Sequence, residues 1–216
     1  MRQTVIDAVR KEKLIVIVRG VEREKLIPLA EAMYDGGVRL LEITFSQDGR
    51  VSDEETAERI AMLASAMRGK MLIGAGTVTE PSQVELVKAA GGLFIISPDT
   101  CDEVIRRTRE LGLVSMPGAL TPSEAMAAHR AGADFVKLFP LGELGAPYLK
   151  ALKAPLSGIE FLAVGGVDLD NIGELLKAGA AGFGVGSNIV KSELVKEEKY
   201  GDLTALARTY VAAVSN

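Results

Sequence analysis

The stretch MLIGAGTVTEPSQVELVKAAGGLFIISP, residues 71–98, contains one complete copy of the unit that is expected to build the fold. Its first apolar run predicts a buried strand, and the segment with helical spacing that begins at Pro81 predicts a helix. Gly91 and Gly92 follow this helix, where a left-handed turn favours glycine. A second apolar run then predicts another strand. A helix between two continuously apolar strands is typical of a parallel sheet whose faces are covered by helices.

The same alternation of strand and helix continues along the chain. Eight short apolar runs, bounded by Gly, Pro or charged residues, predict strands, and segments with helical spacing separate them. Such a parallel sheet is either open or closed on itself, and the count of eight favours an α/β fold of the (β/α)8 TIM barrel type. The predicted strands are 14–18, 38–43, 71–73, 93–96, 113–115, 134–138, 160–164 and 181–185. The predicted helices are 22–34, 53–67, 81–90, 101–111, 122–131, 147–152, 169–178 and 202–214.

Before the first strand, residues 1–13 alternate charged and apolar side chains, which predicts an extra N-terminal amphipathic helix. This segment lacks the apolar region and the cleavage site of a signal peptide. The chain has no linker and no break in composition, so we expect one (β/α)8 domain over residues 1–216. Two polar stretches lie outside the predicted elements. We expect 46–53 to form a mobile loop over the site and 191–200 to be a solvated connection.

The composition narrows the class of ligand and partner. The 216 residues include 25 basic and 29 acidic side chains, which give a net charge of −4, and only 5% are aromatic. Such a chain lacks the basic surface and the stacking aromatics of nucleic-acid-binding proteins. One Cys and one His exclude an internal disulfide and a structural zinc cluster, and no apolar run reaches the roughly 20 residues of a membrane span. We therefore expect a cytoplasmic protein whose partners are small molecules rather than nucleic acid or membrane.

Two charged side chains interrupt predicted strands where their neighbours are apolar. Lys137 lies in FVKLFP, residues 135–140, and burial would lower its pKa, giving a neutral amine that can attack a carbonyl carbon. Glu42 lies in LEITF, residues 41–45, where burial would raise its pKa to values useful for proton transfer. The alternatives are a lysine that extends out of the barrel mouth and a Glu42 that is held in a salt bridge with Arg19.

Chemistry in a TIM barrel lies at the carboxyl ends of the strands, and several further candidates lie there. Arg19 ends the first predicted strand, Thr77 follows the third and Pro98 follows the fourth. Glycines after the seventh and eighth strands allow backbone N–H groups, and the N-termini of the helices that follow, to approach a phosphate. Tight turns without a ligand are the alternative explanation. These candidates are Gly165, Gly166, Gly186 and Ser187.

In combination, these segments resemble the class I aldolases for 2-keto-3-deoxy-6-phosphogluconate (KDPG) and 4-hydroxy-2-oxoglutarate (KHG). The resemblance spans nearly the whole chain and implies a TIM-barrel lyase that needs no metal or other cofactor and forms a homotrimer. The motifs are LEITF around Glu42, GAGTV at 74–78, ISP at 96–98, MPG at 116–118, KLFP at 137–140, GG at 165–166 and VGS at 185–187.

The resemblance also implies a role for each candidate residue. Lys137 resembles the family's Schiff-base lysine, and Glu42 resembles its general acid/base. Thr77 looks like the residue that helps to hold the pyruvate carboxylate. Phe139 looks like part of the pocket lining. The implied substrate-binding residues are Arg19, Thr77, Pro98, Phe139, Gly165, Gly166, Gly186 and Ser187.

Two positions depart from the gluconate-type pattern. Many gluconate-type members have Arg where this chain has Ser46, and Thr where it has Val164. Val164 and Arg19 resemble the related galactonate-type aldolases instead. Arg19 is the nearest candidate to hold the carboxylate in place of the missing Arg, because its guanidinium offers a two-pronged donor. The preferred stereochemistry at C4 of the sugar acid is therefore left open.

The implied reaction is reversible retro-aldol cleavage of KDPG or KHG to pyruvate plus glyceraldehyde 3-phosphate or glyoxylate. The alternatives are the galactonate epimer as substrate, a metal-dependent pyruvate aldolase, a phosphosugar isomerase or epimerase on the same barrel, and a phosphometabolite-binding protein without activity. Trapping of pyruvate by borohydride would separate the Schiff-base mechanism from a metal-dependent one, in which carboxylates and an ion stabilise the enolate.

Overall fold

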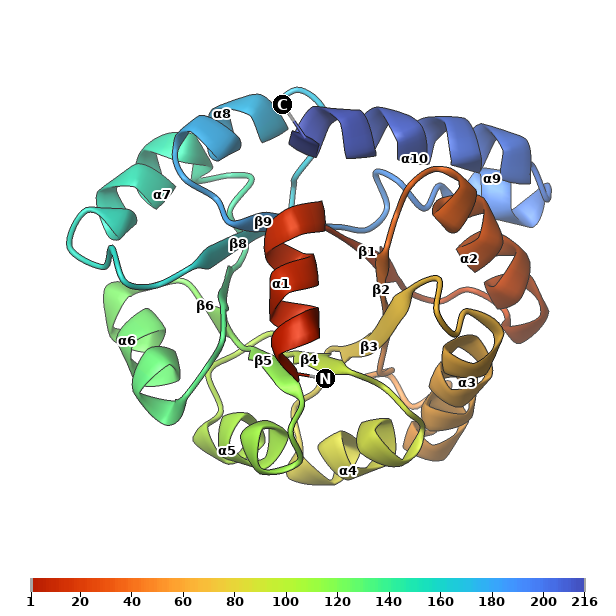
Figure 1. The fold of residues 1–216 in the computed structure, drawn as a ribbon, viewed down its shortest axis with the longest axis horizontal. Helices are drawn as coiled ribbons and strands as arrows, with labels where there is room; N and C mark the ends of the chain where they lie inside the picture. Colours follow the sequence, from red (N-terminus) through yellow and green to blue (C-terminus); the bar gives the residue numbers. More distant parts are fainter. Residues whose placement is uncertain (1, 216) are drawn as a thin grey trace.

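Residues 2–215 are described by the computed structural model, in which a ring of parallel strands is surrounded by helices (Figure 1). The strands follow the order β5-β4-β3-β2-β1-β9-β8-β7-β6, and neighbouring strands in this order are parallel. Their bounds are β1 Leu14–Val18, β2 Leu40–Thr44, β3 Leu72–Gly76, β4 Phe94–Ile96, β5 Val114–Met116, β6 Gly118–Ala119, β7 Val136–Leu138, β8 Phe161–Val164 and β9 Gly182–Val185.

Pro117 divides one barrel strand into β5 and β6, so the labelled strands fill the eight positions of a (β/α)8 barrel. Proline has no N–H to donate to a neighbouring strand, and the ladder is interrupted at this residue. The ring nevertheless continues across it. The Lys137 N–H donates to the Pro117 carbonyl over 2.8 Å, and the Ser97 N–H donates to the Met116 carbonyl over 3.3 Å. The predicted TIM barrel is confirmed.

The helices begin where the sequence offers caps. The Ser52 hydroxyl accepts the Glu55 N–H before α3, and Thr121 and Glu124 form a reciprocal capping box before α6. Helices α2 to α8 and α10 form the outer ring (Figure 1). Their bounds are α1 Arg2–Glu12, α2 Leu26–Asp35, α3 Asp53–Ala66, α4 Pro81–Ala89, α5 Asp102–Glu110, α6 Pro122–Ala131, α7 Gly145–Lys153, α8 Ile172–Lys177, α9 Ser192–Lys196 and α10 Tyr200–Ser215, with a 3₁₀ turn at Arg23–Lys25.

Several sequence-based boundaries were wrong in detail; the third strand, for example, continues beyond 71–73 to Gly76. The fifth strand extends beyond 113–115, because β6 resumes the pairing after Pro117. The segment 191–200 is not a plain connection, since it contains α9 and the first residue of α10. Helix α9 buries Val195 but few other side chains, so its sequence shows charge without a periodic apolar face.

The hydrophobic core has two parts. An outer cluster packs between the strands and the ring of helices, and an inner cluster fills the barrel. Helix α1 lies across one mouth of the barrel (Figure 1) and contributes Val5, Ile6 and Val9 to the inner cluster, where they pack with Phe94 and Phe135. Each such buried side chain contributes roughly 1.5–3 kcal/mol. This mouth, at the amino ends of the strands, is therefore closed by an apolar helix face.

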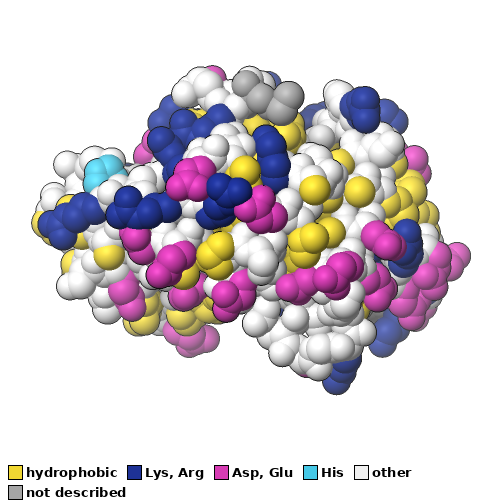
Figure 2. Space-filling model, turned by 90° about the horizontal axis from the view of Figure 1, so that it is seen from below, with side chains coloured by type: hydrophobic (Ala, Val, Ile, Leu, Met, Phe, Trp, Pro, Cys, Tyr) yellow, Lys and Arg dark blue, Asp and Glu magenta, His cyan; other side chains and the backbone are white. Residues whose placement is uncertain are grey.

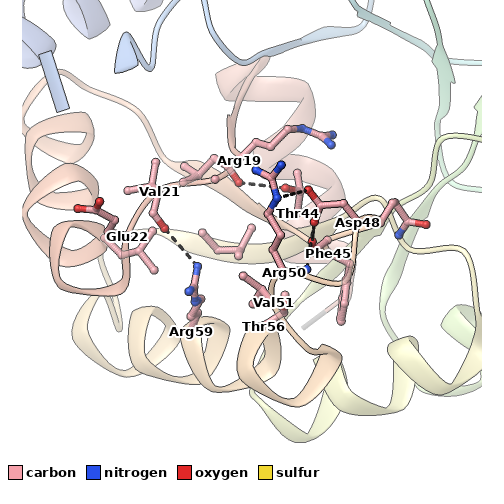
Figure 3. A pocket seen from close by; sticks show the side chains of 16 residues that line it. Arg19, Val21, Glu22, Thr44, Phe45, Asp48, Arg50, Val51, Thr56 and Arg59 are labelled. Atoms are coloured by element: carbon pink, nitrogen blue, oxygen red, sulfur yellow. Dashed lines mark hydrogen bonds and ion pairs between the residues drawn. The ribbon is translucent and has the colours of Figure 1, made fainter. Parts of the chain in front are cut away.

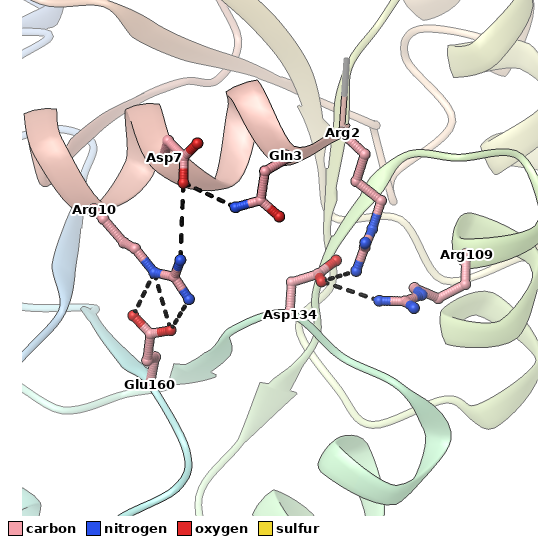
Figure 4. Close-up of polar contacts among 7 residues, drawn as sticks. All are labelled: Arg2, Gln3, Asp7, Arg10, Arg109, Asp134 and Glu160. Carbon is pink, nitrogen blue, oxygen red and sulfur yellow. Dashed lines mark hydrogen bonds and ion pairs between the residues drawn. The ribbon is translucent and has the colours of Figure 1, made fainter.

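Ion pairs surround this closed mouth (Figure 4). Arg10 of α1 binds Glu160 with a shortest N–O distance of 2.6 Å. The carboxylate of Asp134, just before β7, contacts Arg2 of α1 and Arg109 of α5, the latter over 3.0 Å. Because the arginines are partly exposed, these pairs add less than the apolar contacts do. They fix the direction in which α1 crosses the mouth.

On the face that lies at the bottom of Figure 1, the side chains of the described residues form no large patch of one charge sign. Figure 2 shows acidic and basic side chains interspersed there, with hydrophobic side chains in small separate patches. Among the residues described, no helix is both long enough and apolar enough to span a membrane.

Candidate active site

Glu42 and Lys137 both lie inside the barrel, near the carboxyl ends of β2 and β7. Only 2% of Glu42 and 8% of Lys137 are exposed. Glu42 pairs in register with Ile17 of β1 and Gly74 of β3, while Lys137 pairs with Gly118 and Leu162. The two side chains are close enough that the charge of each shifts the pKa of the other. The topology thus brings together the two residues that interrupt apolar strands in the sequence.

Burial governs the protonation of Glu42. Removal from water raises the pKa of the Glu42 carboxyl to about 7, while the charges of Lys137 and Arg19 oppose this shift. Its Oε2 atom is buried, and no group in the described part of the chain forms a hydrogen bond with it. A carboxyl group with a pKa near neutrality can both accept and return a proton at physiological pH.

Burial also lowers the pKa of the Lys137 ammonium, and the Arg19 charge adds to this effect, while Glu42 and Asp99 oppose it. The Nζ atom lies 4.7 Å from the centroid of the Phe139 ring. Phe139 itself is 38% exposed, so it lies at the opening above the amine. A lowered pKa increases the fraction of neutral amine, which is the nucleophilic form.

The predicted alternative for Glu42, a salt bridge with Arg19, is not formed. No guanidinium nitrogen of Arg19 lies within 4.0 Å of a carboxyl oxygen of Glu42. Arg19 Nη2 donates instead to Thr77 Oγ1 over 3.0 Å. Thr77 has a φ of +57°, a left-handed conformation that costs a β-branched residue roughly 1–3 kcal/mol. Backbone strain of this kind clusters at functional sites. Arg19 and Thr77 thus form a polar pair where β1 and β3 end.

Pro98 lies against the break between β5 and β6. A side chain at Gly118 would place its Cβ 2.2 Å from the Pro98 carbonyl oxygen, so glycine is required for this close approach. Thr100 fixes the same turn, because its hydroxyl donates to the Gly118 carbonyl over 2.6 Å. The MPG motif therefore allows the loop after β4 to lie beside Lys137, with which Gly118 pairs.

Gly165 and Gly166 form the turn after β8, with φ values of +82° and +74°. A Cβ on Gly165 would lie 2.8 Å from the Phe139 ring, and the Gly142 N–H donates to the Gly165 carbonyl over 2.6 Å. Glycine is therefore needed here for both the backbone conformation and the space. The turn lies directly against the loop after Lys137.

Gly186 and Ser187 follow β9, and the side chain of the next residue, Asn188, joins this segment to the loop after β8. Asn188 Nδ2 donates to the Val167 carbonyl over 2.8 Å. Ser187 is exposed, so its hydroxyl is available to a ligand. The helices that follow the two strands do not begin at these glycines: residues 186–190 form a turn before α9 begins at Ser192, and α8 begins only at Ile172.

A cavity of about 530 Å³ opens beside Arg19, where β1 and β2 end (Figure 3). Its floor includes Phe45 and Thr56, and the loop after β2 forms its rim. In that loop Ser46 donates to Asp48 Oδ1 over 2.5 Å, and Arg50 binds the other Asp48 oxygen over 3.0 Å. Ser46 is thus engaged within its own loop, which leaves Arg19 as the guanidinium beside Thr77.

The fold is a TIM barrel that holds a buried amine and a buried carboxyl group near its carboxyl mouth, the end at which TIM-barrel enzymes have their active sites. A family model described as KDPG and KHG aldolase matches residues 5–206. The chain belongs to this family of carbon–carbon lyases.

Individual relatives agree with this assignment. The chain is 36% identical to the 2-dehydro-3-deoxy-6-phosphogalactonate aldolase of Escherichia coli, over 94% of this chain and 97% of that one. It is also 36% identical to the 2-dehydro-3-deoxy-phosphogluconate aldolase of Pseudomonas aeruginosa, over 79% and 76%. The structure of KDPG aldolase from Legionella pneumophila, with pyruvate captured as a covalent carbinolamine, superposes with a TM-score of 0.84 at 32% identity, covering 94% of this chain and 96% of that one.

Several residues that shape the site do not stand out in the sequence. Gly142 joins the loop after β7 to the turn after β8, Asn188 joins the loop after β9 to the loop after β8, and Gly118 leaves room for Pro98. Gly118 is the glycine of the MPG motif, but the motif alone does not show that the Pro98 carbonyl approaches it. Gly142 and Asn188 carry no local signal, because their partners are distant in sequence.

Proposed function

We propose that this chain catalyses reversible retro-aldol cleavage of KDPG, and of KHG as a smaller substrate, through a Schiff base on Lys137. The observation that carries the proposal is the buried pair. Lys137 is the only buried lysine in residues 2–215. It lies close enough to the buried Glu42 carboxyl group for the Glu42 charge to shift its pKa. A covalent amine nucleophile has no use in an isomerase, an epimerase or a binding protein.

In the proposed mechanism the neutral Lys137 amine adds to the C2 carbonyl carbon of the 2-keto-4-hydroxy acid. Loss of water gives an iminium. Glu42, directly or through a water molecule, accepts the proton of the C4 hydroxyl. The C3–C4 bond breaks, its electron pair moves into the iminium to form an enamine, and the aldehyde leaves. The enamine then takes a proton at C3, and hydrolysis of the resulting iminium releases pyruvate and the free amine.

The remaining candidates bind the two ends of the substrate in this proposal. Arg19 and Thr77 hold the carboxylate of the keto acid, because a guanidinium and a hydroxyl both donate hydrogen bonds to it. Pro98 and Phe139 form the walls beside Lys137. Backbone N–H groups and the Ser187 hydroxyl bind the phosphate. The phosphate-binding residues are Gly165, Gly166, Gly186 and Ser187.

A second candidate substrate is the galactonate epimer, 2-keto-3-deoxy-6-phosphogalactonate. Val164 favours it, because this side chain belongs to the inner cluster at the end of β8 and offers no hydroxyl to a substrate. A relative that is 36% identical carries the corresponding name. The test is to assay both epimers on the wild type and on Val164→Thr. An unchanged preference for the gluconate epimer in both proteins would show that residue 164 does not govern the choice.

The test of the mechanism is reduction with borohydride in the presence of pyruvate, followed by mapping of the modified residue by mass spectrometry. We expect the adduct on Lys137. The Lys137→Ala variant should lose both trapping and turnover, the latter by more than about 10⁴-fold. Its fold should be retained, since removal of a buried amine also removes a desolvation cost. Trapping on another lysine would refute the assignment, and chelator-sensitive cleavage without trapping would favour a metal-dependent aldolase.

The proposal includes a cytoplasmic homotrimer, as the family resemblance implies. A light-scattering mass of about three times the chain mass of 22.9 kDa is the expected result. A mass equal to one chain at assay concentration would refute it.

A further inference from the structure

Gly76, the last residue of β3, lies against the carboxyl group of Glu42. A Cβ on Gly76 would lie 2.1 Å from Glu42 Oε1 and 2.7 Å from Glu42 Cδ. Contacts under 3.0 Å essentially never occur for real Cβ atoms, so a side chain here would displace the carboxyl group. Gly76 lies in a strand and does not have a positive φ. The backbone conformation therefore does not require glycine at this position, whereas the space does.

Hydrogen bonds within the protein do not hold the Glu42 carboxyl group. Among residues 2–215, Glu42 Oε2 is buried without a partner, and no side-chain hydrogen bond to Oε1 is formed. A buried carboxyl group is usually oriented by donors, because an unpaired polar group in the interior is costly. Packing, including the close approach of Oε1 to Gly76, therefore limits the position of this side chain.

A second glycine on the same strand has a different partner. A Cβ on Gly74 would lie 2.3 Å from the ring of Phe94, which belongs to the inner cluster. Gly74 thus makes room for an apolar side chain of the core. Gly76, two residues further along the same face, makes room for a charged one.

We propose that Gly76 is a positioning residue for Glu42: its missing side chain leaves the space that Oε1 occupies, and so fixes the orientation from which the carboxyl group exchanges the substrate proton. The proposal rests on the proposed role of Glu42 as the acid/base. It assigns to the second glycine of the GAGTV motif a part in proton transfer that acts only through Glu42.

The first experiment compares Gly76→Ala with the wild type. A displacement of about 1 Å is expected to lower kcat roughly 10²-fold with KM nearly constant, and to move the limb of the pH profile that reports Glu42. Borohydride trapping with pyruvate should stay within a few-fold of wild type, because Lys137 is untouched. Gly173→Ala in α8 is the matched control, since the same methyl group meets no atom within 4 Å there. Its kinetics should equal those of the wild type.

Three results would overturn the proposal. The first is Gly76→Ala with wild-type kcat and pH profile. The second is a lower kcat with an unchanged pH profile, which would assign Gly76 a structural role. The third is joint loss of trapping and cleavage in a folded variant, which would show a collapsed site. If the wild type itself does not cleave the substrate, the proposed function fails instead, and the stability experiment below still decides whether Gly76 and Glu42 meet.

The second experiment measures thermal unfolding of Gly76→Ala in two backgrounds. With Glu42 present, the added methyl group should lower Tm by about 3–10 °C or prevent folding, as overpacking does. In a Glu42→Ala background the carboxyl group is gone, so the same substitution should change Tm by less than about 2 °C. An equal loss of Tm, or failure to fold, in both backgrounds would place the clash elsewhere, for example on Thr44 Cγ2 at 3.2 Å, and would refute the proposal.

Discussion

The two mouths of the barrel treat a buried carboxyl group in opposite ways. At the closed mouth, the Asp134 carboxylate contacts Arg2 and Arg109 and accepts the Ser115 N–H, so both of its oxygen atoms have partners. At the open mouth, Glu42 is also buried, but no group in residues 2–215 forms a hydrogen bond with its Oε2 atom. The first arrangement joins α1, α5 and the start of β7, and the second leaves a buried carboxyl group whose pKa is raised to about 7.

The same contrast extends to the side chains around each group. Helix α1 covers the closed mouth with Val5, Ile6 and Val9 and joins it to neighbouring elements by ion pairs (Figure 4). The open mouth instead carries a strained Thr77 and an exposed Phe139. Stability and reactivity are thus separated along the barrel axis, as in TIM-barrel enzymes generally. Substitutions at the two ends should therefore change different measured quantities.

The largest expected effect is on turnover at the open mouth. Glu42→Gln keeps the shape of the side chain but cannot accept a proton, so kcat should fall about 10²- to 10⁴-fold. Slow trapping of pyruvate by borohydride should persist, because Lys137 can still add to the carbonyl carbon. Cleavage by this variant at the wild-type rate would remove Glu42 from the mechanism.

The same variant should change the dependence of stability on pH. Burial raises the pKa of Glu42 from 4.5 to about 7, so the unfolded chain releases this proton more readily than the folded one does. The stability that this group contributes is complete below pH 4.5 and is lost as the pH rises to about 7. Gln does not ionise. Glu42→Gln should therefore gain on the wild type between pH 5 and pH 8, by about 1–3 kcal/mol in unfolding free energy.

Denaturant unfolding at several pH values measures this difference. A variant that loses stability relative to wild type as the pH rises would show that Glu42 is stabilised as the anion. In that case the contrast between the two mouths would fail, because the open-mouth carboxylate would be paired as fully as Asp134.

Much of this contrast could be predicted from the sequence. The first strand was placed correctly at 14–18, because Lys13 and Arg19 bound an uninterrupted apolar run. Glu42 and Lys137 could be selected because a charge inside an apolar strand has few explanations. Their burial could be predicted because the neighbouring residues in each strand are apolar.

The remainder depends on contacts between distant segments. The partner atoms of Gly76, on β2, and of Gly142, after β8, are fixed only when the barrel closes. Asp134 was placed in a strand, but nothing local indicates that Arg2 binds it, more than a hundred residues earlier in the chain. Periodicity reports which face of an element is buried and not which residue of another element it meets.

A smaller effect is expected at the closed mouth. Asp134→Asn retains an acceptor for the Ser115 N–H but loses the charge that binds Arg2 and Arg109. Because both arginines are partly exposed, and because burial raises the pKa of the Asp134 carboxyl in spite of them, the unfolding free energy should fall by only about 1 kcal/mol, which lowers Tm by roughly 2–4 °C. The kcat of the folded variant should equal that of the wild type. A normal Tm with reduced kcat would reverse the division of roles between the two mouths.

The smallest effect is expected at the rim of the open mouth, where a residue should contribute to binding without taking part in the chemistry. Ser187 is exposed after β9, so Ser187→Ala removes one hydrogen-bond donor that water partly replaces. The loss in kcat/KM for a phosphorylated substrate should lie near the lower end of about 1–3 kcal/mol. Unphosphorylated KHG should be nearly unaffected, since it has no phosphate to bind. This difference between substrates separates the rim from the floor, because Glu42→Gln should slow both substrates alike. Equal losses for both substrates in Ser187→Ala would place this hydroxyl at the reacting carbons rather than at the phosphate.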